Sequence, residues 1–414
     1  MNNGATSPEI GPQQVREAFA FTDEIVEGYP GRLAGSESCH KAAERIKAQF
    51  EQCCDAGSVK IDTCEIHPQS LVKIIPVLAV LYLTCVALLY FVPSLAWVSF
   101  AGLALGMLAF AAQVGMHWHV LDPLFPKKQG YNVYGSIEPS GEVKQQIILS
   151  GHHDAAYVFH IRERLPKLYA PLRKIDGILL FVAMLVSLSA AILPYFGMAL
   201  PQWVSLVFLI LGILIVPFFF LTTSMASPGA GDDMMAVAIA AGAGKLFNDA
   251  KKAGSNPLKH TRLILLSVDA EECGLRGSSA WIKRHLAELK ATKTFAFNMD
   301  PIYKFKNLEF YDHDLSSRVK LSREMAQECV DIATALGYKA YIAPPRKGAA
   351  TDAANYGLAG IEATNFHGMS SREQDLAGWV YHTRNDVSKY IEPEVVEAAL
   401  KIIREYILGK DAGA

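Results

Sequence analysis

The chain has 414 residues and a formal net charge of −2, which gives no electrostatic reason to expect nucleic acid as a partner. Its seven cysteines are odd in number and include no CxxC pair, which argues against a disulfide framework and against a structural zinc knuckle. Hydrophobic residues make up 51% of the sequence, a high share for a soluble protein, and the excess is concentrated in two stretches.

The first stretch follows a hydrophilic part, residues 1–72, with helical patterns at 13–27 and 36–54 and a strand pattern at 59–66. Between Lys73 and His117 there is no charged side chain, a run of about forty residues with Pro93 near its middle. That length fits two transmembrane helices, at 74–92 and 96–116, joined by a tight turn.

The second uncharged stretch follows residues 118–175, which contain β-prone runs at 131–134 and 145–149. It lies between Asp176 and Asp232 and is interrupted near Pro194 and Pro201, so spans are expected at 177–193 and 203–222. Buried core helices are the alternative for both stretches, but runs this long without charge exceed a core helix.

The last part, residues 225–414, again alternates between strand and helix patterns. The β-prone runs are 262–268, 294–299 and 361–366, and the helical patterns are 236–253, 278–289, 317–336 and 393–408. We therefore expect one α/β domain with a mostly parallel, mixed sheet flanked by helices. Residues 1–72, 118–175 and 225–414 would form it, with transmembrane hairpins inserted at 73–117 and 176–224.

Each hairpin would enter and leave the bilayer on the same side, so all hydrophilic parts share one face. The hairpin tips at 93–95 and 195–202 carry no charge, whereas the outer flanks are basic. The basic flanking residues are Lys73, Lys127, Lys128, Arg162, Arg164, Lys167, Arg173 and Lys174. By the positive-inside rule, the sequence predicts a multi-pass membrane protein whose hydrophilic domain lies on the cytoplasmic face.

Five distant segments offer histidine or carboxylate side chains, several of them directly after apolar strand patterns. They contain His152, Asp232, Glu271-Glu272, Asp300 and His382. In α/β sheets, ligands bind at the carboxyl ends of strands. Imidazole and carboxylate ligands without thiolate suit zinc or a similar divalent ion, so the combination predicts a hydrolytic metal site.

These segments resemble, in the same order, the motifs of the co-catalytic di-zinc aminopeptidase family, which also contains glutamate carboxypeptidase and glutaminyl cyclase. The family pattern is H-x-D, G-A-x-D, E-E-x-G-L-x-G-S, N-x-D and Y-H-T. The matching segments are residues 152–154, 229–232, 271–278, 298–300 and 381–383, with softer matches at 31–36 and 351–352. The resemblance covers nearly all the hydrophilic sequence and implies the zinc-exopeptidase fold.

The resemblance also implies a ligand set. His152 and Asp300 would hold one metal ion, Glu272 and His382 would hold the other, and Asp232 would bridge both. The expected cofactors are two zinc ions, with another divalent metal as an open alternative.

The resemblance implies roles for three further residues. Glu271 would be the general base that takes a proton from a metal-activated water. Asp154 would orient the imidazole of His152, and Tyr381 would donate to the developing oxyanion. One departure from the family pattern is Asp233-Met234, which alters the wall behind the bridging carboxylate.

The expected function is a membrane-integrated zinc exopeptidase, with an aminopeptidase as the leading case. Peptides and the lipid bilayer are the expected partners, and a homo-oligomer is compatible with the sequence. A glutaminyl-cyclase-like single-zinc acyltransferase and a non-catalytic receptor or scaffold on the same fold remain alternatives.

The second hairpin lies between two predicted ligands, His152 and Asp232. Its return segment, residues 223–231, spans at most about 30 Å when fully extended. We therefore expect the metal site to lie close to the bilayer surface.

Overall fold

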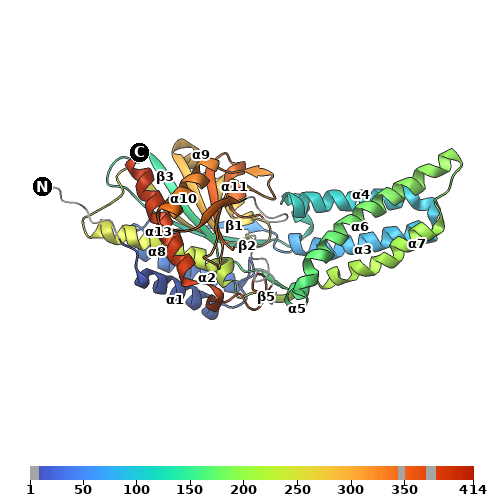
Figure 1. Cartoon of the computed structure of the whole chain (residues 1–414), viewed down its shortest axis with the longest axis horizontal. Helices are drawn as coiled ribbons and strands as arrows, with labels where there is room; N and C mark the ends of the chain where they lie inside the picture. The colour runs from blue at the N-terminus through green and yellow to red at the C-terminus, as the bar shows by residue number, and fades with distance from the viewer. Residues whose placement is uncertain (1–8, 344–349, 370–378) are drawn as a thin grey trace. The chain divides into compact units, whose positions relative to one another are not determined.

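The computed structural model describes residues 9–343, 350–369 and 379–414, and the chain forms two compact units. Unit 1 comprises Met1–Ile66, Lys128–Tyr157 and Met225–Ala414, and unit 2 comprises His67–Lys127 and Val158–Ser224. Figure 1 labels several of the helices and strands.

An eight-stranded sheet is the framework of unit 1 (Figure 1). In spatial order its strands are β1 (Lys60–Ile66), β2 (Lys128–Ile137), β6 (Thr261–Val268), β3 (Gln145–His152), β7 (Lys293–Ile302), β12 (Glu362–Gly368), β8 (Leu308–Tyr311) and β11 (Ala340–Ala343). The central strands β6, β3, β7 and β12 run parallel, whereas the pairs β1–β2, β2–β6 and β12–β8 are antiparallel. The predicted α/β fold with a mostly parallel, mixed sheet is confirmed.

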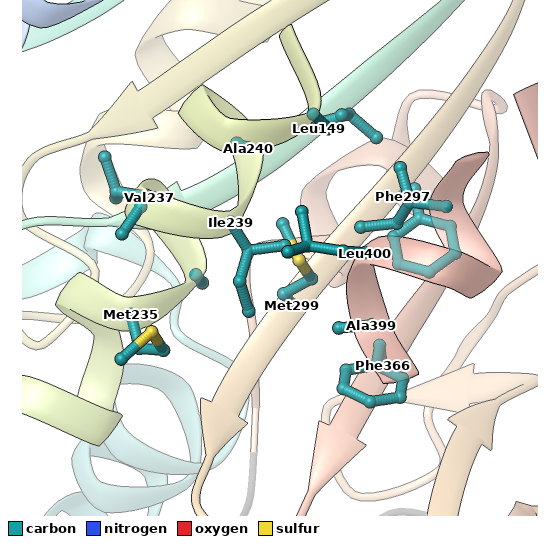
Figure 2. Close-up of a cluster of buried hydrophobic side chains, with 14 of the residues drawn as sticks. Leu149, Met235, Val237, Ile239, Ala240, Phe297, Met299, Phe366, Ala399 and Leu400 are labelled. Carbon is teal, nitrogen blue, oxygen red and sulfur yellow. The ribbon is translucent and has the colours of Figure 1, made fainter. Parts of the chain in front are cut away.

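Alternate side chains of the central strands enter two hydrophobic cores, one on each face of the sheet. On β3, Ile147 and Leu149 belong to the larger core, whereas Ile148 between them belongs to the smaller one. Figure 2 shows part of the larger core, in which Ile239 and Leu400 from two helices meet Met299 from β7. Burial on both faces explains why these strands are almost continuously apolar.

Helices supply the outer layer of each core. The larger core receives side chains from α1 (Pro12–Gly28), α2 (Glu37–Cys53), α8 (Met235–Lys252), α10 (Arg323–Ala335) and α13 (Pro393–Ala412). The smaller core receives them from α9 (Arg276–Ala291) and α11 (Ala353–Leu358).

The structure differs from the sequence patterns where elements are short. The predicted helix at 317–336 starts only at Arg323, because the Oγ of Ser322 caps it by accepting a hydrogen bond from the backbone N of Met325 at 3.2 Å. Upstream, β10 (Val319–Lys320) pairs with β9 (His313–Asp314). The patterns do not predict β8, β11 or α11, because four to six residues contain too few repeats to show a period.

Unit 2 is helical. Among the described residues, four helical segments are long and apolar enough to cross a membrane: Ser70–Phe91, Pro93–Gly115, Gly177–Phe196 and Gln202–Phe220. They contain α3 (Ser70–Phe91), α4 (Ala96–Phe110), most of α6 (Pro166–Ile192) and α7 (Gln202–Leu211). The segments agree with the expected spans to within a few residues.

The helices of unit 2 pack through small side chains and leave large apolar ones outside. A Cβ added to Gly102 of α4 would lie 2.6 Å from Sγ of Cys85 on α3, so glycine permits the close approach. In contrast, Phe91, Leu105 and Ile213 are 69%, 65% and 70% exposed. An apolar outer surface of this kind marks contact with a partner or a membrane rather than with water.

Each insertion leaves unit 1 and returns to it at neighbouring backbone positions. Ile66 at the end of β1 is paired with Lys128 at the start of β2. At the second insertion, the backbone N of Ser227 donates a hydrogen bond to the carbonyl O of Ala156 at 2.8 Å. Each insertion therefore begins and ends at adjacent points of unit 1, as a hairpin does. The small two-stranded sheet of β4 (Tyr157–Phe159) and β5 (Thr222–Ala226) continues the second pairing.

Candidate metal centre

Two of the predicted ligands come from adjacent parallel strands. His152 is the last residue of β3. The register pairs Ser150 of β3 with Asn298 of β7, so Asp300, two residues further along β7, reaches the same end of the sheet as His152. Parallel pairing therefore brings together two side chains that are far apart in the sequence.

The other predicted ligands come from connecting segments. Asp232 lies in the segment Ala230–Met234 before α8, Glu272 follows β6, and His382 precedes α13. A Cβ added to Gly231 would lie 2.1 Å from Cε1 of Tyr303, so glycine lets the chain carrying Asp232 approach that ring.

The carboxylate of Asp232 lies between two histidines. Its Oδ1 is 3.3 Å from Nε2 of His152, and its Oδ2 is 3.1 Å from Nε2 of His382. The same nitrogen of His382 is 3.3 Å from Oε1 of Glu272. The structure thus forms two groups that share Asp232, with donor atoms within 4.8 Å of one another in each. The groups are His152, Asp232 and Asp300, and Asp232, Glu272 and His382.

The protein alone does not satisfy these buried donor atoms. His152, Asp232 and Asp300 are 1%, 2% and 5% exposed. Within the described part of the chain, Nε2 of His152, Oδ2 of Asp232 and Oε1 of Glu272 are buried and make no hydrogen bond. Leaving polar atoms buried in this way is costly, and a divalent cation would supply the missing partner. Nitrogen and oxygen donors without sulfur fit zinc in a hydrolytic site.

The pKa shifts of the ligand-type side chains also indicate a cation site. Burial raises the pKa of Glu272 and raises that of Asp300 well above its ordinary value. Burial also acts to raise the pKa of Asp232, but the adjacent imidazoles of His152 and His382 outweigh it and hold that pKa low. Burial acts to lower the pKa of His382, yet the carboxylates of Glu272 and Asp232 raise it to about 10. The cluster therefore favours positive charge, which bound cations would provide in place of protons.

Asp154 connects the two halves of the site. Its Oδ1 and Oδ2 accept hydrogen bonds from the backbone N of Glu271 at 3.1 Å and of Glu272 at 3.2 Å. Its Oδ1 is 3.3 Å from Nδ1 of His152, and its carbonyl O is 3.0 Å from the same nitrogen. One carboxylate thus holds the glutamate pair against the strand that carries His152.

Replacing Asp154 by asparagine is expected to weaken zinc binding by about 10–100-fold, the usual effect of losing a partner that orients a ligand. An amide has only one acceptor oxygen, so one of the two backbone N–H groups loses its acceptor. Zinc titration against a competing chelator measures the change. Asp249→Asn, which removes a partly exposed partner of Lys245 on α8, is the control and should leave affinity unchanged. Wild-type affinity in Asp154→Asn would contradict the role.

Glu271 and Tyr381 lie beside the ligand groups. Oε2 of Glu271 is 3.9 Å from Nε2 of His152, and burial raises the pKa of Glu271 well above its ordinary value. The ring of Tyr381 stacks on that of His382, with centroids 4.0 Å apart and planes inclined by 19°. Burial raises the pKa of Tyr381, which keeps its hydroxyl protonated as a donor.

Sequence reasoning missed two residues that support the site. Oδ1 of Asp386 accepts a hydrogen bond from the backbone N of Gly231 at 2.8 Å, next to Asp232. Nδ1 of His367 is 3.0 Å from the carbonyl O of Asp300. Neither lies in a motif, and the only signal for Asp386 is its position a few residues after the Y-H-T segment.

Two residues within or next to the matched segments also support the site. Oδ2 of Asp233, the departure noted above, accepts a hydrogen bond from the backbone N of His152 at 3.1 Å. The buried guanidinium of Arg32 donates to the carbonyl O of His153 at 3.0 Å and to that of Pro228 at 2.8 Å. Arg32 therefore holds the end of β3 together with the segment that returns from the second insertion.

Comparison with known proteins supports this interpretation. Residues 216–407 match Peptidase family M28. A segment of 72 residues, 17% of this chain, is 40% identical to the probable glutamate carboxypeptidase of Arthroderma benhamiae, and it spans 10% of the length of that relative.

Solved structures share the fold at low sequence identity. A zinc aminopeptidase from Bacillus subtilis, BSAP, matches with a TM-score of 0.57 and 13% identity, covering 97% of this chain and 96% of that one. The glutaminyl cyclase of Porphyromonas gingivalis matches with a TM-score of 0.57 and 13% identity, covering 96% and 98%. A Zn-dependent exopeptidase from Parabacteroides distasonis matches with a TM-score of 0.55 and 13% identity, covering 97% and 99%.

The chain thus has the fold of the solved zinc exopeptidases, and its buried histidine and carboxylate groups share one aspartate. Residues 216–407 resemble peptidase family M28.

Proposed function

We propose that this protein is a membrane-integrated, zinc-dependent exopeptidase that removes residues from the amino terminus of peptides. The observation that carries the proposal is the position of Asp232, which is shared by two groups of buried ligand-type side chains. A shared carboxylate suits two adjacent divalent ions because it offsets their mutual repulsion. Solved structures with this fold include proteins named as zinc aminopeptidases, which supports the choice of reaction.

Each residue has a defined task in this proposal. His152 and Asp300 would hold one ion, Glu272 and His382 the other, and Asp232 both. When bound, such ions lower the pKa of a water molecule and polarise the peptide carbonyl.

The proton and the developing charge are handled by the chain's own side chains. Glu271 takes a proton from the attacking water and delivers it to the leaving amine, and its raised pKa suits both transfers. Asp154 keeps Glu271 in position through its backbone N. Tyr381 donates its O–H to the oxygen on which negative charge develops.

The test uses full-length protein in detergent, loaded with zinc, and matched peptides with free or acetylated amino termini. We expect stepwise release of single residues from the free peptides and none from the acetylated ones. A glutaminyl-cyclase-type enzyme would instead cyclise amino-terminal glutamine and release no residue, and a scaffold would do neither. Metal analysis should give two zinc ions per chain in the proposed site, and a single ion there would favour the cyclase alternative.

Membrane integration is the second part of the proposal. Unit 2 supplies four apolar helical segments of spanning length, and their outer side chains are exposed and apolar. The tips between the paired helices carry no charge, whereas the flanks carry lysine and arginine. We therefore assign unit 1 to the cytoplasmic face.

The place where the insertions leave unit 1 supports a site close to the membrane. Ala156, two residues before the second insertion, follows Asp154 by two residues. Ile66, the residue before the first insertion, packs in one cluster with Ala270 and Cys273, which flank the glutamate pair. The second insertion thus starts a few residues after Asp154, and the residue before the first insertion packs with the residues that flank the glutamate pair, which suits peptides that are themselves held at the bilayer.

A peptide acylated away from its free amino terminus should be hydrolysed about ten-fold faster or more than the unmodified peptide at equal bulk concentration, when the protein is in bilayers. The acyl chain concentrates substrate at the membrane by about 0.8 kcal/mol for each buried CH₂. Initial rates measure the effect, and a water-soluble aminopeptidase is the control that should not prefer the acylated peptide. Equal rates with the membrane protein would reject supply from the bilayer.

A further inference from the structure

A separate cluster of ligand-type side chains lies in unit 1, apart from the five residues of the metal centre. It contains Cys39, His153 and Asp269, whose donor atoms lie within 4.8 Å of one another. All three side chains are fully buried, at 0% exposure. They come from three elements, since Cys39 is on α2, His153 follows β3 and Asp269 follows β6.

His153 is held in place and has one unused ring nitrogen. Its Nδ1 is 2.8 Å from Oγ of Ser267, and its backbone N donates to the carbonyl O of Val268 at 2.9 Å. Within the residues that the structure describes, its Nε2 is buried and makes no hydrogen bond. A histidine oriented through one nitrogen, with the other unsatisfied, has the arrangement of a metal ligand and its supporting partner.

The other two groups are also positioned. Sγ of Cys39 lies 3.4 Å from Oδ1 of Asp269. Oδ2 of Asp269 accepts a hydrogen bond from the backbone N of Tyr131 at 3.0 Å, and its backbone N donates to Oδ1 of Asn132 at 2.9 Å. Cys39 is in the first turn of α2, and burial raises the pKa of its thiol, so binding of an ion there would release the thiol proton.

We propose that Cys39, His153 and Asp269 bind a further divalent ion, with zinc as the favoured metal, in a site that stabilises the fold. Thiolate, imidazole and carboxylate are all zinc ligands, and one thiolate with one carboxylate balances the charge of Zn²⁺. Three protein ligands leave the fourth tetrahedral position to a water or a neighbouring group. The site is separate from the metal centre, because His152 and His153 are consecutive residues at a strand end and point to opposite sides.

An ion bound at this site would also stabilise the neighbouring segments of unit 1. His153 follows the predicted ligand His152, and Asp269 precedes Glu271 by two residues. An ion held there ties α2 to the ends of β3 and β6, which carry the catalytic segments. Loss of the ion should therefore lower the melting temperature as well as the metal content.

Sulfur ligation is the measurement that separates the two sites, because the metal centre offers only nitrogen and oxygen. Full-length protein in detergent, loaded with zinc, is examined by X-ray absorption at the zinc edge. We expect a zinc–sulfur distance of about 2.3 Å in the wild type. Cys39→Ser should lose that signal and one zinc per chain, whereas the matched variant Cys64→Ser, in a neighbouring buried position, should keep both.

Asp269→Asn is the second variant, since it keeps every thiol and should still lose one zinc per chain. If Cys39→Ser does not fold, the wild-type signal and the Asp269→Asn metal count decide the question. Absence of a zinc–sulfur distance in the wild type, or a full signal in folded Cys39→Ser, would overturn the proposal. The readout is metal ligation, so it stands whether or not the protein hydrolyses peptides.

Discussion

Replacing Glu271 by glutamine is expected to lower kcat for peptide hydrolysis by about 10²–10⁴-fold, the usual contribution of a general acid–base group, with zinc still bound. Glutamine has nearly the same shape but does not accept the proton. The backbone N of Glu271, which donates to Asp154, is unchanged by the substitution. Steady-state rates and zinc content, measured on the same sample, give both results.

The informative control is the adjacent residue. Glu272→Gln alters a side chain in the group with Asp232 and His382, so it should lose zinc as well as activity. Glu271 also lies near His152 and Glu272 in a third group of potential ligands, which makes a ligand role a real alternative. Loss of zinc from Glu271→Gln would establish that alternative, and an unchanged kcat would place the base elsewhere.

Asp232→Asn is expected to release zinc from both positions of the metal centre and to reduce hydrolysis to background. The carboxylate of Asp232 is the one group common to both ligand sets, and an amide has neither its charge nor its second acceptor oxygen. Affinity should fall by more than the about 10–100-fold that losing an outer partner costs. Zinc per chain after dialysis against a chelator, less the one ion expected at Cys39, His153 and Asp269, measures the change.

His382→Ala is the matched comparison, because it removes a ligand from only one of the two groups. It should keep about half of the zinc that the wild-type metal centre retains, whereas Asp232→Asn keeps almost none. Zinc-dependent thermal stabilisation should follow the same order, since an ion that binds only the folded state raises its stability. Equal zinc retention in the two variants would show that Asp232 is not shared.

The pattern of hydrophobic residues predicted the central strands and the long helices well, because those patterns depend on the local period of the chain. The run around Leu149 is an example, since a strand buried on both faces is apolar throughout. Prediction failed at β8, β11 and α11, and at the start of α10. Short elements show no period, and a cap such as Ser322 decides a boundary through one hydrogen bond.

The two uncharged stretches and the set of histidines and acids that can hold metal follow from length, charge and residue type, which are properties of the chain. The position of Asp232 between His152 and His382 follows only from the folded structure. It alone showed that Asp386 supports this segment, and that Cys39 reaches Asp269. The physical reason is that strand register and helix packing set distances between side chains that are separated by up to hundreds of residues, and no local pattern records those distances.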